Sequence, residues 1–220
     1  MKSRTIFSYF VSLPLFLFFV GCTHTLDVTN LSSYRATQVT SLKAHKTIGI
    51  ICNSSEIADK RLVKGIATSL NSQCDVVMPY SQGSSRQVDY VVKLDIGSEY
   101  KGSGYNFLIN WPGFLIFAPA WNGYIYNINY NLDVALTKNS DKTTIDSFKV
   151  PINLDVRHAN YNRTWTELSW LEVSAIAFVG GILFTQYDDN VTPLVIDKVE
   201  TPIGDYVAQE ILSRISAQEI

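Results

Sequence analysis

The polar residues best placed to do chemistry lie between positions 157 and 167. His158 has the sequence parity of the buried face of a predicted strand, and polar side chains surround it among large apolar residues. An imidazole in such a setting can act as a general base or line a small-ligand pocket. It can equally belong to a polar network that closes a strand-to-helix connection. We favour this interpretation because polar networks with a purely structural role also shift the pKa values of their members. The other members of this candidate polar site are Arg157, Asn160, Arg163 and Glu167.

No pattern in the sequence specifies a reaction, a cofactor or a metal. His24, His45 and His158 are far apart in the chain, and no two of them have the spacing of a metal-ligand pair. The sequence also lacks Gly-x-Ser-x-Gly, the phosphate-binding loop, Gly-x-Gly-x-x-Gly and Cys-x-x-Cys. We therefore expect a protein that is not an enzyme and that binds no cofactor.

The amino terminus has the layout of a secretory signal peptide. Lys2 and Arg4 supply positive charge, residues 6–20 are largely apolar, and the small residue Gly21 precedes Cys22. The apolar run is shorter than the roughly 20 residues that a helix needs to cross a bilayer core, which argues against a transmembrane anchor.

The segment Phe19-Val20-Gly21-Cys22 resembles the bacterial lipobox, although Phe19 stands where that pattern prefers an aliphatic residue. The resemblance implies that Cys22 carries a thioether-linked diacylglycerol, that the protein incorporates palmitate, and that Cys22 becomes the first residue after cleavage. It also implies the periplasmic leaflet of the outer membrane, if the host has two membranes, because Thr23 is not the aspartate that retains many such proteins in the inner membrane.

Composition sets the domain organisation and excludes one class of partner. The chain has 220 residues, a formal net charge of −2 and 12% aromatic residues. The scattered basic residues exclude a nucleic-acid footprint, so the membrane, through the lipid, and an envelope protein are the partners that we consider. We divide the chain into a signal peptide (1–21), a Ser/Thr/Asn-rich lipidated tether (22–46) and a single α/β periplasmic domain (47–220), with the oligomeric state left open.

Residues 124–136 predict the central strand of an antiparallel sheet. Their even positions are apolar or aromatic and their odd positions include three asparagines and an aspartate, which is the period of a half-buried strand. The same alternation predicts strands at 88–96 and 148–156. The polar residues 138–142 predict a hairpin between the strand 124–136 and the strand 148–156. Pro151 lacks an amide proton and indicates an edge strand.

A βαβ unit is predicted before this meander. The apolar run 47–52, a helix capped by Ser55 and a second apolar run at 75–79 occur in that order. In this arrangement Cys52 ends one strand and Cys74 begins its parallel neighbour, so the two thiols should be more than about 10 Å apart and unable to form a disulfide. The fold class is thus α/β (α+β), with a mixed sheet flanked by two or three helices.

Two segments are apolar without alternation. Residues 107–121 contain Pro112-Gly113, placed for a type II turn, and residues 173–184 belong to a helix that a capping box opens at 164–167. A last helix is predicted to begin at Thr201-Pro202. We expect the two apolar segments to bury each other; otherwise they form a surface for a partner or for lipid. The residues of that interaction surface would be Trp111, Phe114, Phe117 and Trp121.

From Thr47 to the end, the order of the predicted elements resembles small domains of bacterial envelope lipoproteins, among them those near the curli-secretion lipoprotein and the amino-terminal domain of the Tol-system propeller protein. The resemblance implies an assembly or interaction role and no catalytic residues. The prediction is therefore a lipid-anchored envelope protein that acts through protein or membrane contacts. The alternative is a periplasmic hydrolase or small-ligand-binding protein with its site around His158.

Overall fold

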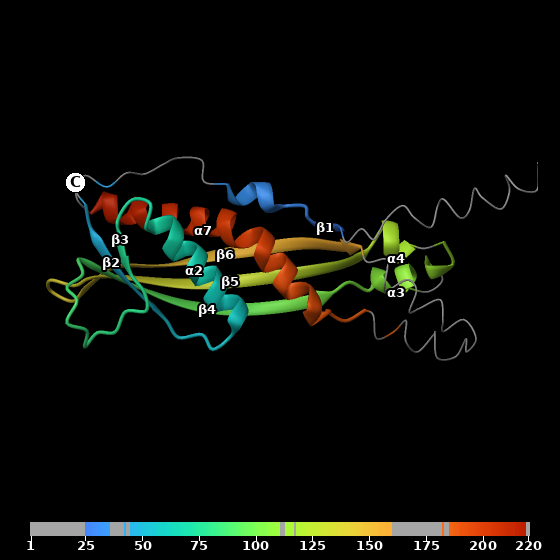
Figure 1. Ribbon diagram of the computed structural model, residues 1–220, viewed down its shortest axis with the longest axis horizontal. Coiled ribbons are helices and arrows are strands. Elements are labelled where there is room, and N and C mark those ends of the chain that lie inside the picture. The colour runs from blue at the N-terminus through green and yellow to red at the C-terminus, as the bar shows by residue number, and fades with distance from the viewer. Residues whose placement is uncertain are drawn as a thin grey trace, which may run out of the picture.

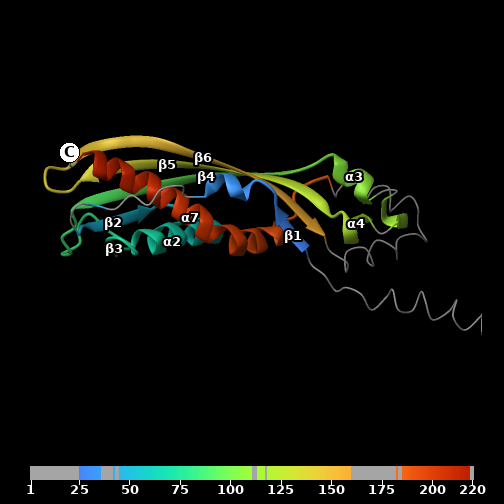
Figure 2. The same ribbon diagram turned by 90° about the horizontal axis from the view of Figure 1, so that it is seen from above.

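The computed structural model describes residues 25–35, 42, 45–110, 113–116, 118–159, 182 and 185–218. Six strands form one mixed sheet in the order β1-β6-β5-β4-β2-β3, and helices α2 and α7 cover one face of it (Figures 1 and 2). The predicted α+β class and the mixed sheet are therefore confirmed. The strands are β1 (Thr25–Val28), β2 (Thr47–Cys52), β3 (Asp75–Val77), β4 (Tyr90–Gly102), β5 (Tyr124–Lys138) and β6 (Thr143–Ala159).

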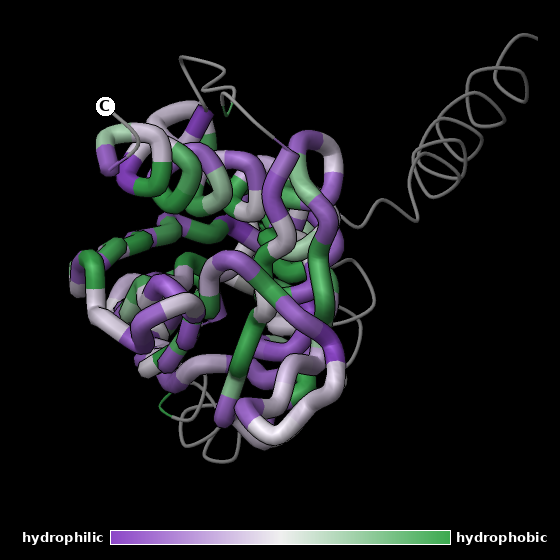
Figure 3. Tube along the Cα trace, turned by 90° about the vertical axis from the view of Figure 1, so that its left-hand side faces the viewer, coloured by the Kyte–Doolittle hydropathy of each residue, from purple (hydrophilic) through white to green (hydrophobic). Residues whose placement is uncertain are grey.

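The antiparallel meander β4-β5-β6 is the centre of the molecule, as the alternation predicted. Along β5 the even positions are buried under the helices, with Tyr124, Tyr126 and Tyr130 at most 1% exposed. The odd positions lie on the other face, where Asn127 donates to Asp155 on β6 at 2.8 Å. Colouring by hydropathy shows this alternation along the strands (Figure 3). One apolar face and one polar face explain why the register holds, since a slip by one residue would exchange them.

The predicted βαβ unit is present. β2 pairs in parallel with both β3 and β4, and α2 (Ile57–Leu70) connects β2 to β3. The predicted N-cap is wrong by one position, because the N-cap of α2 is Glu56 and not Ser55. The Ser54 hydroxyl accepts a hydrogen bond from the Glu56 amide at 3.2 Å. The Ser54 hydroxyl also donates to the Asp59 carboxylate at 2.5 Å, which ties the loop to the first turn of the helix.

The two thiols of this unit lie at opposite ends of it. Asp75, next to Cys74, pairs with Thr47, whereas Cys52 pairs with Leu94 at the other end of β2. Both cysteines are free thiols. Burial raises the pKa of the Cys74 thiol to about 11, and Asp75 contributes to the rise.

The last helix is longer than predicted. α7 spans Thr192–Ala217, so Pro202 lies inside it and not at its start, and the amino-terminal proline is Pro193 instead. The cause is burial: the turns before Pro202 bury Val195, Ile196 and Val199 in the core, which outweighs the lost backbone hydrogen bond. The predicted apolar face of the later turns is confirmed, since Ile203, Val207, Ile211 and Ile215 are fully buried.

Helices α2 and α7 cross at two glycines. A Cβ on Gly65 would lie 2.4 Å from the Glu200 carbonyl oxygen, and one on Gly204 would lie 2.6 Å from the Gly65 carbonyl carbon. Next to the crossing, Ser69 donates to Asp205 at 2.7 Å. Arg61 pairs with Asp197 at 2.6 Å and with Glu200 at 2.8 Å. The two helices therefore form one rigid layer on the sheet.

Part of the segment predicted as a tether belongs to the fold. β1 pairs antiparallel with the end of β6, and a 3-10 helix, η1 (Leu31–Tyr34), follows it. Beyond β1, two side chains continue the hydrogen bonding to β6 that a longer strand would make. The Asn30 side-chain oxygen accepts from the Asp155 amide at 3.0 Å, and the Tyr34 hydroxyl accepts from the Asn153 amide at 2.7 Å. Pro151 lies beyond both, in a part of β6 that pairs only with β5, as predicted for an edge.

The helix predicted from 164 to 184 lies outside the described residues, apart from Ile182. Within the part of the chain that the structure describes, no helix is both long and apolar enough to cross a membrane.

Candidate functional site

Four strand ends meet at one end of the sheet. Gly102 at the end of β4 pairs with Tyr126, Tyr124 at the start of β5 pairs with His158, and Thr25 at the start of β1 pairs with Ala159. Gly123 precedes β5 with a φ of +73°, and a Cβ there would lie 2.6 Å from the Ala159 amide nitrogen. Glycine is thus required at the point where the connection from β4 returns to the sheet.

This connection, residues 103–123, contains α3 (Tyr105–Asn110), the 3-10 helix η2 (Gly113–Ile116) and α4 (Ala118–Trp121). All of them lie beyond the end of the α2–α7 layer (Figure 1). The segment was predicted as an apolar excursion between two strands, and the structure confirms this position. The predicted turn at Pro112-Gly113 falls partly outside the described residues, and Gly113 begins η2.

Asparagines attach α3 to the sheet. The buried Asn106 amide donates to the Ile125 carbonyl at 2.9 Å and accepts from the Ile125 amide at 2.7 Å, so it pairs with β5 as a neighbouring strand would. Asn110, 3% exposed, accepts from the Tyr124 hydroxyl at 3.0 Å. Between them, Ile109 belongs to the core cluster. The side of α3 that faces the protein is therefore largely polar and fully bonded to the sheet.

The outward side of the connection is apolar. Tyr105 and Leu108, one turn apart on α3, are 47% and 53% exposed, and Ile116 and Trp121 are each 65% exposed. The Trp121 indole donates to the Ile116 carbonyl at 2.8 Å, which fixes the ring beside η2. We call these four residues the apolar tip. On α3 two large apolar side chains are thus exposed while two asparagines are buried, whereas an ordinary surface helix buries its apolar side chains and exposes its polar ones.

The apolar tip carries no formal charge. Residues 103–123 include no Asp, Glu, Lys, Arg or His. The nearest charged side chains stand at its base: Lys101 pairs with Glu99 at 2.8 Å, and the exposed Arg157 donates to Asn122 at 3.2 Å. An uncharged apolar end of this kind can bury itself against lipid or against an apolar protein surface.

Of the predicted interaction surface, the structure describes one side chain. Trp121 is exposed on α4, whereas only the backbone of Phe114 is described, and Trp111 and Phe117 lie outside the described residues. Sequence reasoning missed Tyr105 and Leu108. The signal that could have found them is the spacing of Asn106 and Asn110, which marks the opposite side of the same helix.

The predicted polar site is only partly described. His158 is buried on β6, 5% exposed, on the helix-covered face of the sheet. Arg157 points to the opposite face and is exposed. Asn160, Arg163 and Glu167 lie outside the described residues. The structure therefore does not bring Arg157 and His158 together.

Other polar groups in the core were not predicted. Asp59 is 2% exposed, and burial, helped by the charge of Glu56, raises the pKa of its carboxyl against the lowering effect of the Ser54 hydroxyl. Tyr100, Tyr126, Tyr130 and Tyr187 form an aromatic cluster, in which Tyr100 and Tyr187 have ring centroids 4.9 Å apart. Burial is the main cause that raises the pKa of Tyr130 and of Tyr187. These hydroxyls stay protonated and serve packing.

The described part of the surface includes two grooves. One of about 290 Å³ lies between α2 and α7 and is lined by Lys64, Ser72 and Asp205 among others. The other, of about 620 Å³, lies at the far end of the sheet from the apolar tip and is lined by Lys46, Asp89 and Lys138 among others. Among the described residues, no three His, Cys, Asp or Glu side chains are grouped so that they could hold a metal ion.

No protein-family model matches the chain, and no curated protein matches it. Among solved structures, the minor lipoprotein of Acinetobacter baumannii is similar at 10% identity and a TM-score of 0.38, over 80% of this chain and 95% of that one. The uncharacterized lipoprotein B of Nitrosomonas europaea is similar at 10% identity and a TM-score of 0.40, over 84% and 90%. TolB of Acinetobacter baumannii is similar at 10% identity and a TM-score of 0.30, over 59% of this chain and 26% of that one. The chain thus resembles bacterial lipoproteins, but similarities at this level assign it neither a family nor a function.

Proposed function

We propose that this protein is a lipid-anchored component of the bacterial cell envelope that acts through protein or membrane contacts and catalyses no reaction. The observation that carries the proposal is the apolar tip, a fixed and uncharged surface whose four apolar side chains are 47% to 65% exposed. The lipobox-like segment ending at Cys22 supplies the anchor. In a host with two membranes, Thr23 favours the outer membrane, with the folded domain in the periplasm.

The contact role is favoured over the hydrolase alternative by the arrangement of β6. Its two described candidate residues, Arg157 and His158, lie on opposite faces of the sheet. Hydrogen bonds in the core, such as the one from Tyr124 to Asn110, connect the tip to the sheet. This is the construction of a rigid contact surface.

The anchor is tested by labelling cells with radioactive palmitate. We expect the native protein to incorporate the label and to sediment with membranes, and we expect Cys22→Ser to lose both properties because it lacks the thiol that forms the thioether. Cys52→Ser is the matched control, since it removes another thiol of the same chain and should leave the label unchanged. Equal labelling of the native protein and Cys22→Ser would overturn the proposal.

A further inference from the structure

We infer that the apolar tip inserts into the interface of the same membrane that holds the lipid on Cys22, so that the domain stands on its tip with the sheet pointing away from the bilayer. This inference deepens the proposed function and rests on it. It selects a lipid surface, and not a protein, as the occupant of the tip.

The first argument is the place where the chain enters the fold. Thr25 pairs with Ala159, and the Ala159 amide adjoins Gly123, two residues after Trp121 at the end of α4. Cys22 precedes Thr25 by three residues, which span at most about 11 Å even when fully extended. A lipid on Cys22 therefore holds this end of the sheet, and no other, close to the bilayer surface.

The second argument is the chemistry of the apolar tip. Trp and Tyr are the residues that settle at the level of the lipid headgroups, because their rings have an apolar body and a polar edge. The tip presents Trp121 and Tyr105 beside the aliphatic Leu108 and Ile116. A charge buried at this depth would oppose insertion, and residues 103–123 contain none.

The third argument concerns the base of the tip. Lys101, which pairs with Glu99, lies one residue before the end of β4, and Arg157 lies two residues before the end of β6. Both side chains are exposed at the height where headgroup phosphates would lie once the tip is inserted. Long basic side chains reach such phosphates while their stems remain along apolar surface. By contrast, the far end of the sheet exposes Lys138, Asp141 and Lys142, which have no apolar side chains grouped with them among the described exposed residues.

The test uses the full mature chain carrying Cys22→Ser, so that no lipid anchor contributes. Its partitioning onto vesicles of phosphatidylethanolamine and phosphatidylglycerol is measured by flotation. We expect measurable binding that falls by about tenfold when Ile116→Ser and Trp121→Ser are added, because two apolar side chains no longer leave water. Leu108→Ser, which removes no described hydrogen bond, should weaken binding in the same direction.

The matched control is Ile57→Ser on α2, away from α3 and α4 (Figure 1), since Ile57 is 78% exposed and its loss should leave binding unchanged. Thermal unfolding checks that every variant is folded. Absence of vesicle binding by the chain with an intact tip, or equal binding by the tip variants, overturns the inference. The inference is also overturned if the tip variants still bind vesicles but no longer associate with envelope proteins in the absence of lipid. Because the tested protein lacks the lipid anchor on Cys22, the result of this test is independent of the palmitate labelling.

Discussion

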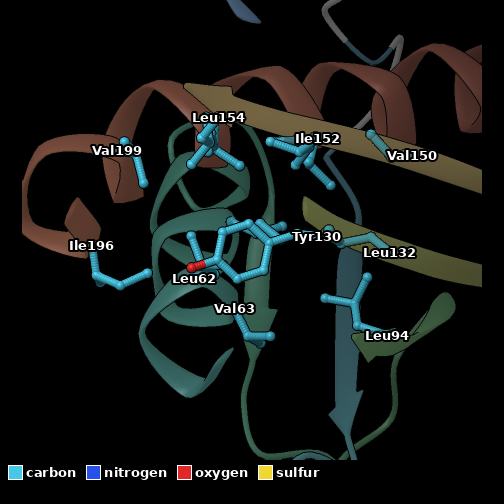
Figure 4. Packing of buried hydrophobic residues seen from close by; sticks show 14 of the residues in the cluster. Leu62, Val63, Leu94, Tyr130, Leu132, Val150, Ile152, Leu154, Ile196 and Val199 are labelled. Atoms are coloured by element: carbon cyan, nitrogen blue, oxygen red, sulfur yellow. The ribbon is translucent and has the colours of Figure 1, made fainter. Parts of the chain in front are cut away.

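At the scale of single residues, Tyr124 and Tyr130 allow a direct comparison within one strand. Both are fully buried on β5. The Tyr124 hydroxyl donates to Asn110 at 3.0 Å, whereas the Tyr130 hydroxyl has no hydrogen-bond partner among the described residues. Figure 4 shows it directed toward Leu62 on α2, among apolar side chains. Burial, first, and the neighbouring Tyr100 hydroxyl raise the pKa of Tyr130, so the group stays neutral.

We expect Tyr124→Phe to lower the free energy of unfolding by about 1–3 kcal/mol, since the buried Asn110 loses a donor. Tyr130→Phe should leave the free energy of unfolding unchanged or raise it by up to about 1 kcal/mol, because it removes a hydroxyl that gains nothing from burial. Urea denaturation measures both values. Equal losses for the two variants would contradict the assignment, and each tyrosine serves as the control for the other.

The burial of these tyrosines was predictable, whereas their bonding was not. The alternation along 124–136 identified Tyr124, Tyr126 and Tyr130 as core residues, and the structure confirms it. Asn110, the partner of Tyr124, stands 14 residues earlier in a segment without periodicity. Which hydroxyl meets an amide depends on how that connection folds back, and no local pattern encodes this.

At the scale of elements, the errors arise where a local signal competes with packing. Thr192-Pro193 and Thr201-Pro202 carry the same start signal, and only the burial of the intervening turn decides that α7 begins at the first. β1 has four residues, too few for alternation to indicate a strand. It forms because the end of β6 offers it a partner and because Asn30 and Tyr34 continue the pairing with their side chains.

The close crossing of α2 and α7 predicts that replacing a helical glycine by alanine lowers stability here, whereas it usually raises stability. In most helix interiors Gly→Ala is stabilising by about 1 kcal/mol. Gly65→Ala should instead destabilise by about 2 kcal/mol or more, since its Cβ would meet the Glu200 carbonyl oxygen at 2.4 Å and backbone cannot rotate away as a side chain can. Denaturant titration gives the value. Gly97→Ala is the control, with nothing within 4 Å of its Cβ, and a stabilising Gly65→Ala would refute the close crossing.

At the scale of the whole molecule, the sheet separates two unlike ends. β5 has 15 residues, and at about 3.3 Å for each residue it holds the ends about 50 Å apart. One end carries the uncharged apolar tip and the entry of the chain at Thr25. The other carries the polar turn after Lys138 and the groove lined by Lys46 and Asp89. With the tip at the membrane, the groove faces away from it, where soluble molecules can reach it.

This polarity predicts an unequal protection of lysines. Lys101 stands at the base of the tip, and Lys138 and Lys142 stand at the far end; all three are exposed. When the lipidated protein is reconstituted in vesicles, acetylation of Lys101 should fall by about threefold, because the headgroup region covers the base of a tip that inserts about 5–10 Å. Acetylation of Lys138 and Lys142 should not change, and mass spectrometry of the labelled peptides measures all three. Trp121→Ser with an intact lipid is the control and should restore the labelling of Lys101, since the lipid alone holds the chain near the membrane without seating the tip. Protection of Lys142 in place of Lys101 would mean that the sheet stands the other way round.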